Sequence, residues 1–125
     1  MLALLTDAHI SPVVAYQVRA LQADIRILSL HEWRGGQLLS VADDRILAAA
    51  MSERLSLVTY DQRTIAPLVT RWGTEGRDHA GVVFIDHRSI AQSDVGGLVR
   101  GLIALWMSAG EQNWTNVVVF LTPRP

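Results

Sequence analysis

Short apolar runs alternate with segments of helical periodicity along the whole chain, and this alternation constrains the fold more than any other feature. The run at residues 81–85 is apolar at nearly every position, which is typical of a strand covered on both faces. Strands that alternate with helices predict a parallel sheet. We therefore predict an α/β protein with a central, mostly parallel five-stranded sheet.

The predicted elements follow one another without a linker or an internal repeat. Ser11 and Pro12 are favourable as the cap and the first residue of a helix. Ser40 and Asp43 are spaced as in a capping box, and Pro67 predicts an irregularity within a helical pattern. Strands are expected at 2–6, 25–30, 55–59, 81–85 and 117–121, helices at 12–21, 41–54, 63–72 and 94–108, and loops at 31–37 and 73–79.

Length and composition predict a single domain spanning residues 1–125, half of which are hydrophobic. The longest apolar stretches have the length of a strand, well short of the roughly 20 residues of a membrane-spanning helix. No charged segment of a signal peptide precedes them. We therefore expect a cytoplasmic protein without a membrane partner. The absence of cysteine excludes disulfides and thiolate metal sites.

The charge pattern allows two interpretations. The formal net charge is −1, so the overall charge gives no argument for binding nucleic acid. All eleven basic residues are arginine, however, and the guanidinium group binds phosphate through two parallel hydrogen bonds, which suits an RNA ligand. Codon usage in a GC-rich genome is the simpler explanation for this bias.

Three aspartates are predicted to meet at one edge of the sheet. Asp7 and Asp61 each follow an apolar strand, and Asp43 shares a helix face with Ile46 and Ala50, which we expect to pack on the sheet. Ligands of open parallel sheets bind at the carboxyl ends of the strands, and hard cations such as Mg²⁺ or Mn²⁺ prefer oxygen ligands. The aspartates therefore predict a metal site. The alternative is that they serve only as turn and cap residues.

Four further residues are candidates for this site. Asp86 ends the fourth predicted strand and is a candidate fourth ligand, although a turn or a salt bridge explains it equally well. Thr59 is a candidate for orienting a water or a phosphate, with strand propensity as the alternative. Arg45 and Arg63 are, from their positions, the candidates for binding an RNA backbone.

Trp33 and Arg34 form an unusual pair in a predicted glycine-containing loop. An aromatic ring beside a cation suits stacking on an unpaired base with a phosphate contact, and it equally suits a protein partner. Packing of Trp33 in the core is a third interpretation. Gly96, Gly97 and Gly101 in the last predicted helix indicate close packing, either on the sheet or on a second copy of the chain, as in a homodimer.

The order of the acids resembles the PIN domain superfamily of metal-dependent nucleases. The matching pieces are a strand that ends at Asp7, the helical segment at 43–50 and the strand end Val-Thr-Tyr-Asp at 58–61. The segments at 79–84 and 94–99 are similar to small bacterial PIN-like proteins of uncharacterised function. The resemblance covers nearly the whole chain, and the order of its short motifs is more specific than any one of them.

This resemblance implies a three-layer α/β/α fold and hydrolysis of RNA with Mg²⁺ or Mn²⁺. Asp7, Asp43 and Asp61 match three of the family's acids. Many PIN nucleases carry a glutamate in the region before the second of these, whereas here the nearest is Glu32 in a predicted loop. The site then holds metal with three acids, recruits a fourth, or has lost catalysis. Related toxins act with an antitoxin protein, which is the partner that the resemblance implies.

Two other functions stay open at this point. The first is a catalytically weak or inactive PIN-like protein that binds a protein or RNA. The second is a metal-dependent phosphatase or a receiver-like phosphate acceptor, but the absence of lysine counts against a receiver that needs a lysine–phosphate contact. No glycine-rich phosphate loop, nucleophile elbow or zinc motif occurs in the sequence.

Overall fold

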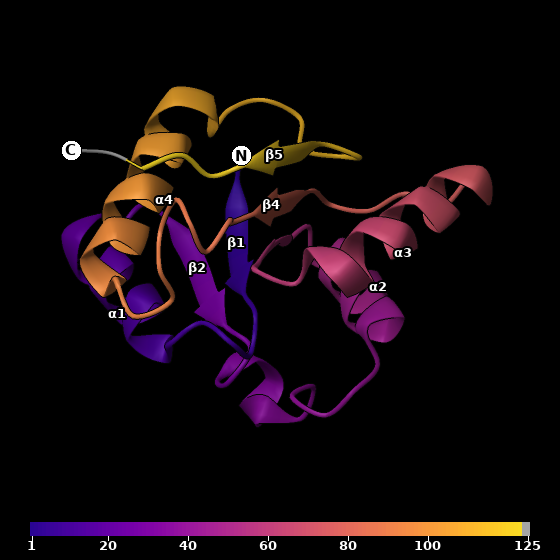
Figure 1. Ribbon diagram of the computed structural model, residues 1–125, viewed down its shortest axis with the longest axis horizontal. Helices are drawn as coiled ribbons and strands as arrows, with labels where there is room; N and C mark the ends of the chain where they lie inside the picture. The colour runs from indigo at the N-terminus through magenta and orange to yellow at the C-terminus, as the bar shows by residue number, and fades with distance from the viewer. Residues whose placement is uncertain (124–125) are drawn as a thin grey trace.

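Five short strands alternate with helices along residues 1–123, the part of the chain that the computed structural model describes (Figure 1). In chain order the elements are β1 (Ala3–Thr6), α1 (Pro12–Leu21), β2 (Arg26–Ser29), the 3-10 helix η1 (Trp33–Gly36), α2 (Asp43–Ser52), β3 (Ser56–Thr59), α3 (Gln62–Thr74), β4 (Val82–Phe84), α4 (Val95–Ala109) and β5 (Val118–Phe120). All five strands pair in parallel, in the order β2-β1-β3-β4-β5. The predicted fold class is confirmed.

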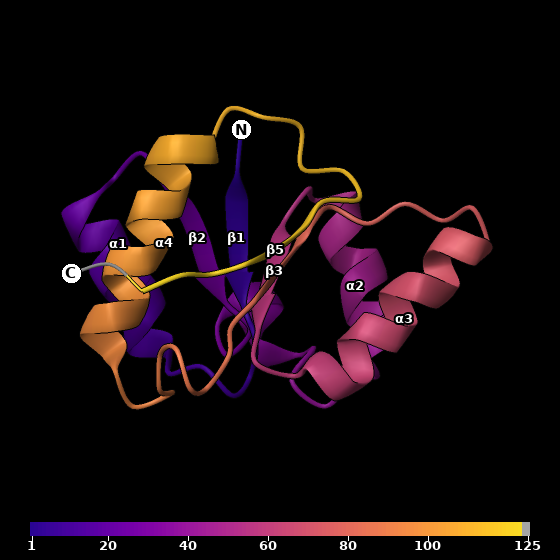
Figure 2. The same cartoon turned by 45° about the horizontal axis from the view of Figure 1, so that its top comes forward.

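Helices cover both faces of the sheet (Figure 2). On one face α1 and α4 pack through residues such as Val18 and Leu98. On the other, α2 and α3 pack through residues such as Ile46 and Ile65. These side chains recur at helical spacing, so each helix turns one apolar stripe to the sheet. No helix within residues 1–123 combines the length and the apolar character needed to cross a membrane.

The sheet grows in opposite directions from its centre. β2 lies on one side of β1, whereas β3, β4 and β5 lie on the other. The helix that follows β1 packs on one face, and the helix that follows β3 packs on the opposite face. In sheets wound in this way, ligands bind outside the carboxyl ends of the two strands at the switch point. The switch point here lies between β1 and β3.

Three local predictions are wrong. The helix α2 begins at Asp43, and Ala42 stands at the cap position without a side-chain bond, so the predicted capping box is absent. The helix α3 continues through Pro67, which is exposed. Water can therefore bind the carbonyl that lacks its helical partner. The predicted loop at 31–37 contains the 3-10 helix η1.

Gly81 leads into β4 with a backbone conformation that favours glycine. Its φ is +103°, and a Cβ atom built on it would lie 2.9 Å from the Ser56 Oγ and 2.9 Å from the Trp114 carbonyl oxygen. Ser56 and Trp114 are both buried, and Ser56 donates a hydrogen bond to the Ala80 carbonyl. A side chain at position 81 therefore meets strain and overlap together.

We expect Gly81→Ala to lower the free energy of unfolding by about 2 kcal/mol or more, since the positive φ and the overlap both oppose a Cβ atom. The control is Gly73→Ala, within α3, where a Cβ atom meets nothing within 4 Å. That substitution is expected to be neutral or to stabilise by about 0.5–1 kcal/mol. Urea unfolding of both variants measures the difference, and equal effects would contradict this account.

Candidate functional site

The carboxylate of Asp7 is buried and held in a fixed orientation at the end of β1. Its exposed fraction is 8%. Its Oδ1 accepts a hydrogen bond from the Ala8 N–H at 2.7 Å, and its Oδ2 accepts one from the Thr59 hydroxyl at 2.6 Å. Thr59 is the last residue of β3, so the second bond joins the two central strands where both end.

The same hydroxyl also contacts the backbone of Asp61. The Asp61 N–H donates to the Thr59 Oγ1 at 3.0 Å, and Thr59 is fully buried. The sequence predicts a substrate contact for Thr59, whereas the structure uses its hydroxyl to position Asp7 and the start of α3. Asp61 itself caps α3, because its Oδ1 accepts from the Thr64 N–H at 3.1 Å.

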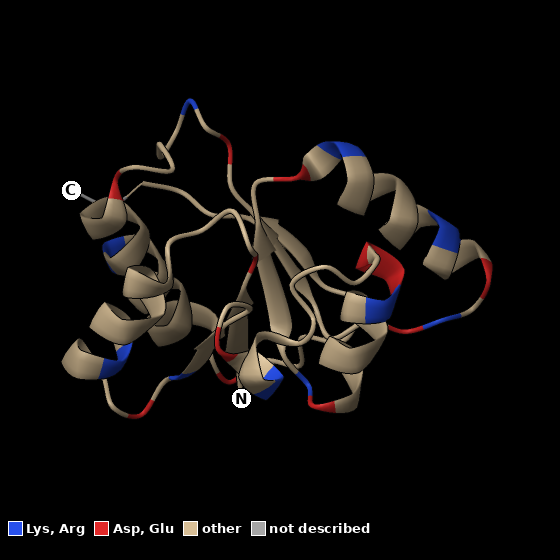
Figure 3. Ribbon diagram, turned by 90° about the horizontal axis from the view of Figure 1, so that it is seen from below, with Lys and Arg blue, Asp and Glu red and all other residues tan. Residues whose placement is uncertain are grey.

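Asp43, the first residue of α2, faces the other two acids. It follows Ala42, which stands at the cap position without a side-chain bond. Burial raises the pKa of Asp43, and the negative charges of Asp7 and Asp61 raise it further, with a smaller contribution from Asp44 and an opposing one from His9. The three predicted acids are therefore near enough for their charges to interact. Figure 3 views this carboxyl edge of the sheet and shows acidic residues at the starts of helices, α2 and α3 among them.

The acidic group does not form a closed cage for one ion. Within residues 1–123, no three histidine, aspartate or glutamate side chains lie close enough together to share a metal directly. A single ion bound directly by Asp7, Asp43 and Asp61 is therefore not the arrangement that this structure holds. Mg²⁺ commonly keeps several waters and binds through one or two carboxylates and substrate phosphates. The oxygen donors fit Mg²⁺ or Mn²⁺ in that partly hydrated form.

Asp86 follows β4 and is paired with Arg88. Its carboxylate accepts hydrogen bonds from the Arg88 Nε at 3.2 Å, the Nη2 at 3.0 Å and the backbone N–H at 2.8 Å. The side-chain bonds and then the backbone bond lower the pKa of Asp86 to about 2. The salt-bridge interpretation is therefore right, and Asp86 is not a free fourth ligand.

Trp33 belongs to the core and does not present an open ring. Its exposed fraction is 5%, and its indole N–H donates to Glu53 at 3.3 Å. The guanidinium of Arg34 lies 4.6 Å from the centre of the ring and binds Glu53 at 2.7 Å. The packing interpretation of Trp33 therefore holds. Its ring leaves no exposed face on which an RNA base could stack.

Glu32, the nearest glutamate before Asp43, is also engaged in hydrogen bonds with other residues. Its carboxylate binds Arg19 at 2.8 and 3.1 Å and accepts from the Ser29 N–H at 2.9 Å. Burial acts to raise the pKa of Glu32, but these donors outweigh it and lower the pKa. Glu32 is therefore not available as a further acid for the group around Asp7.

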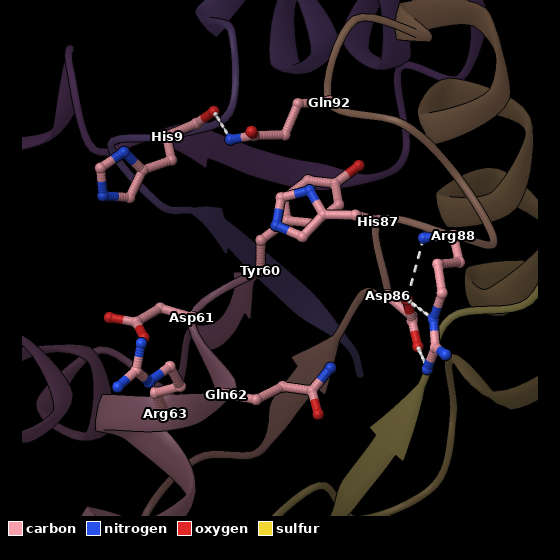
Figure 4. A pocket seen from close by; sticks show the side chains of 9 residues that line it. All are labelled: His9, Tyr60, Asp61, Gln62, Arg63, Asp86, His87, Arg88 and Gln92. Carbon is pink, nitrogen blue, oxygen red and sulfur yellow. Dashed lines mark hydrogen bonds and ion pairs between the residues drawn. The ribbon is translucent and has the colours of Figure 1, made fainter.

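A pocket of about 690 Å³ lies beside the acidic group (Figure 4). Asp61 borders both, and Arg63 and Asp86 line the pocket with the aromatic residues Tyr60 and His87. From the sequence, Tyr60 is a candidate only for orienting a water or a phosphate, and His87 is not a candidate at all. The available signal was their position, since Tyr60 directly follows β3 and His87 lies three residues after the end of β4. Arg63 and Arg45 are both exposed and form no ion pair within residues 1–123.

No protein-family model matches the chain, and searches of curated proteins and of solved structures found no match. The structure establishes a small α/β protein with a five-stranded parallel sheet. Doubly wound sheets with this strand order carry many unrelated activities, so function has to be argued from the site.

Replacement of Thr59 by valine tests whether its hydroxyl organises the site. We expect Thr59→Val to lower the free energy of unfolding by about 1–3 kcal/mol, because a buried carboxylate loses a donor and an N–H loses its acceptor. The matched control is Thr6→Val at the end of β1, where the buried hydroxyl oxygen has no partner within residues 1–123. That change is expected to be neutral or stabilising in urea unfolding. A similar loss in both variants would contradict the assignment.

Replacement of Asp43 by asparagine tests the repulsion among the acids. The folded protein raises the pKa of Asp43 above 3.8, so the charged form is disfavoured by folding at neutral pH. We expect Asp43→Asn to raise the urea midpoint at pH 7. The gain should vanish near pH 3, where the Asp43 carboxyl group is neutral in both the folded and the unfolded protein. Asp24→Asn, at the opposite edge of the sheet, is the control and should change neither midpoint. A gain that persists at the lower pH would refute this explanation.

Proposed function

We propose that this chain is a metal-dependent ribonuclease of the PIN type, which hydrolyses phosphodiester bonds in RNA with Mg²⁺ or Mn²⁺. The proposal is supported by one arrangement: Asp7 follows β1, Asp61 follows β3 and Asp43 begins α2, so that the charges of the first two raise the pKa of Asp43 at the switch point. Carboxylates that are desolvated without a basic partner are costly to keep charged. A cation at this position offsets that cost and explains why the acids converge.

The three acids differ in how they are held, and this suggests a division of roles. Asp7 is fixed by two donors and would give a cation a ligand of constant orientation. Asp43 begins α2, and a cation beside it would stabilise the charged form that burial and the neighbouring acids disfavour. Asp61 uses Oδ1 in its cap and borders the pocket. When bound, the cation supplies Lewis-acid chemistry that stabilises charge on the phosphate and acidifies water.

Two exposed arginines support a phosphate-containing substrate. Arg63 lies in the first turn of α3, two residues after Asp61, and Arg45 lies in the first turn of α2, two residues after Asp43. Both helices therefore begin with an acid followed closely by an arginine. This arrangement suits a nucleic-acid strand, since the acids hold the cation at the scissile phosphate while the arginines contact neighbouring phosphates.

RNA cleavage by the purified protein tests the proposal. Labelled structured and unstructured RNAs are incubated with Mg²⁺ or Mn²⁺, and with EDTA. We expect cleavage to require the metal and to fall on the order of a hundredfold in Asp61→Asn, because an essential charge at the reaction centre is removed. Asparagine caps a helix as well as aspartate does, so this variant should stay folded.

The matched control is Asp94→Asn, which makes the same change at the cap of α4. It should cleave RNA at the wild-type rate, because Asp94 is outside the acidic group. Cleavage in EDTA, or cleavage by Asp61→Asn at the wild-type rate, would refute the assignment. RNA binding without cleavage would instead identify a binding module with the same fold.

A further inference from the structure

The pocket beside Asp61 contains an aromatic pair that the proposed hydrolysis does not use. The rings of Tyr60 and His87 are stacked, with centres 4.6 Å apart and planes inclined by 24° (Figure 4). Tyr60 is nearly buried, and its hydroxyl donates to the Ile90 carbonyl at 2.8 Å. Tyr60, the buried ring of the pair, is therefore held in place by the core.

His87 is exposed and lines the pocket, so one face of its ring rests on Tyr60 while the other is open. The imidazole has no hydrogen bond within residues 1–123 that would hold it away from a ligand. Because Tyr60 holds one face of the His87 ring in place, the exposed face is available for stacking with a planar ligand group. Unpaired bases stack on histidine and other aromatic side chains in this way.

The surroundings of His87 provide the polar groups that a nucleotide needs. Arg63 stands on the opposite wall as an exposed cation. Gln62 and Gln92 bring side-chain amides, which donate to and accept from the edges of bases. The guanidinium of Arg88 binds Asp86, yet its side chain is 90% exposed and can contact a phosphate from its outer side. The volume of about 690 Å³ lies within the range of pockets that hold ligands of this size.

We propose that this pocket is the subsite for one unpaired nucleotide of the RNA, with its base stacked on the open face of His87 and its phosphate at Arg63. The substrate class rests on the proposed ribonuclease function. Because Asp61 borders both the pocket and the acidic group, the next phosphate along the strand would lie at Asp7 and Asp43. His87 is then a residue that selects single-stranded over paired RNA, since a base within a duplex cannot reach the ring.

The test measures binding without cleavage. A fluorescently labelled single-stranded RNA hexamer is titrated in EDTA with the wild type, His87→Ala and His87→Phe, followed by anisotropy. We expect His87→Ala to weaken binding roughly 5- to 100-fold, the loss typical of one stacked base, and His87→Phe to keep most of the affinity. The control is Tyr16→Ala, which removes an exposed aromatic ring from α1 outside the pocket and should bind as the wild type does.

Binding and cleavage separate the two proposals. Loss of binding in His87→Ala, with rescue by phenylalanine, upholds the subsite even if no RNA is cleaved in Mg²⁺ or Mn²⁺. Metal-dependent cleavage with unchanged RNA affinity in His87→Ala overturns the subsite and leaves the ribonuclease proposal standing. Equal affinity of the wild type for the hexamer and its duplex form also overturns it. His87 is exposed, and urea unfolding of both variants confirms that they are folded.

Discussion

One buried hydroxyl group organises the carboxyl edge of this sheet. Thr59 donates to the carboxylate of Asp7 and accepts from the backbone of Asp61, so two chain segments that are 52 residues apart along the sequence share a single polar contact. A buried hydroxyl has one proton to donate, and here that proton is committed to the acid. The orientation of Asp7 and the start of α3 both depend on this contact.

The acidic group places like charges close together at a cost to folding, as is common at functional sites. Asp43 is half-buried near two like charges and lacks the hydrogen bonds that the other two acids have. A chain selected for stability alone would place a neutral or paired residue there. The cost of keeping Asp43 is a reason to assign it a role in binding a cation, because rules of stability are broken mainly at sites of function.

The elements of this fold were largely predictable from the sequence, because each strand is a short apolar run and each helix has an apolar stripe. The start of α2 was not, since Ser40 is the better cap by type and yet Ala42 occupies the position. Pro67 was read as an interruption because the sequence does not show that its side of α3 faces solvent. Local preference decides such points only where tertiary contacts do not.

The positions of the acids at the strand ends could be predicted from the sequence, but their hydrogen-bond partners could not. Asp7 and Asp61 follow strands, and the topology brings the ends of neighbouring strands together. The bond from Thr59 to Asp7 depends on the register of β1 against β3, which periodicity does not give. Whether Trp33 turns to the core or to solvent, and whether His87 meets Tyr60, are likewise settled by packing between distant segments.

A single exposed hydrogen bond joins two loops at the rim of the pocket. The Gln92 side chain donates to the His9 carbonyl at 2.9 Å, and this contact joins two loops that lie 83 residues apart along the chain (Figure 4). The bond is exposed and neutral, so breaking it costs on the order of 1 kcal/mol. The loops can therefore separate without unfolding β1 or α4. In the proposed ribonuclease, a long strand could enter sideways where these loops meet, so cleavage would not be restricted to free ends.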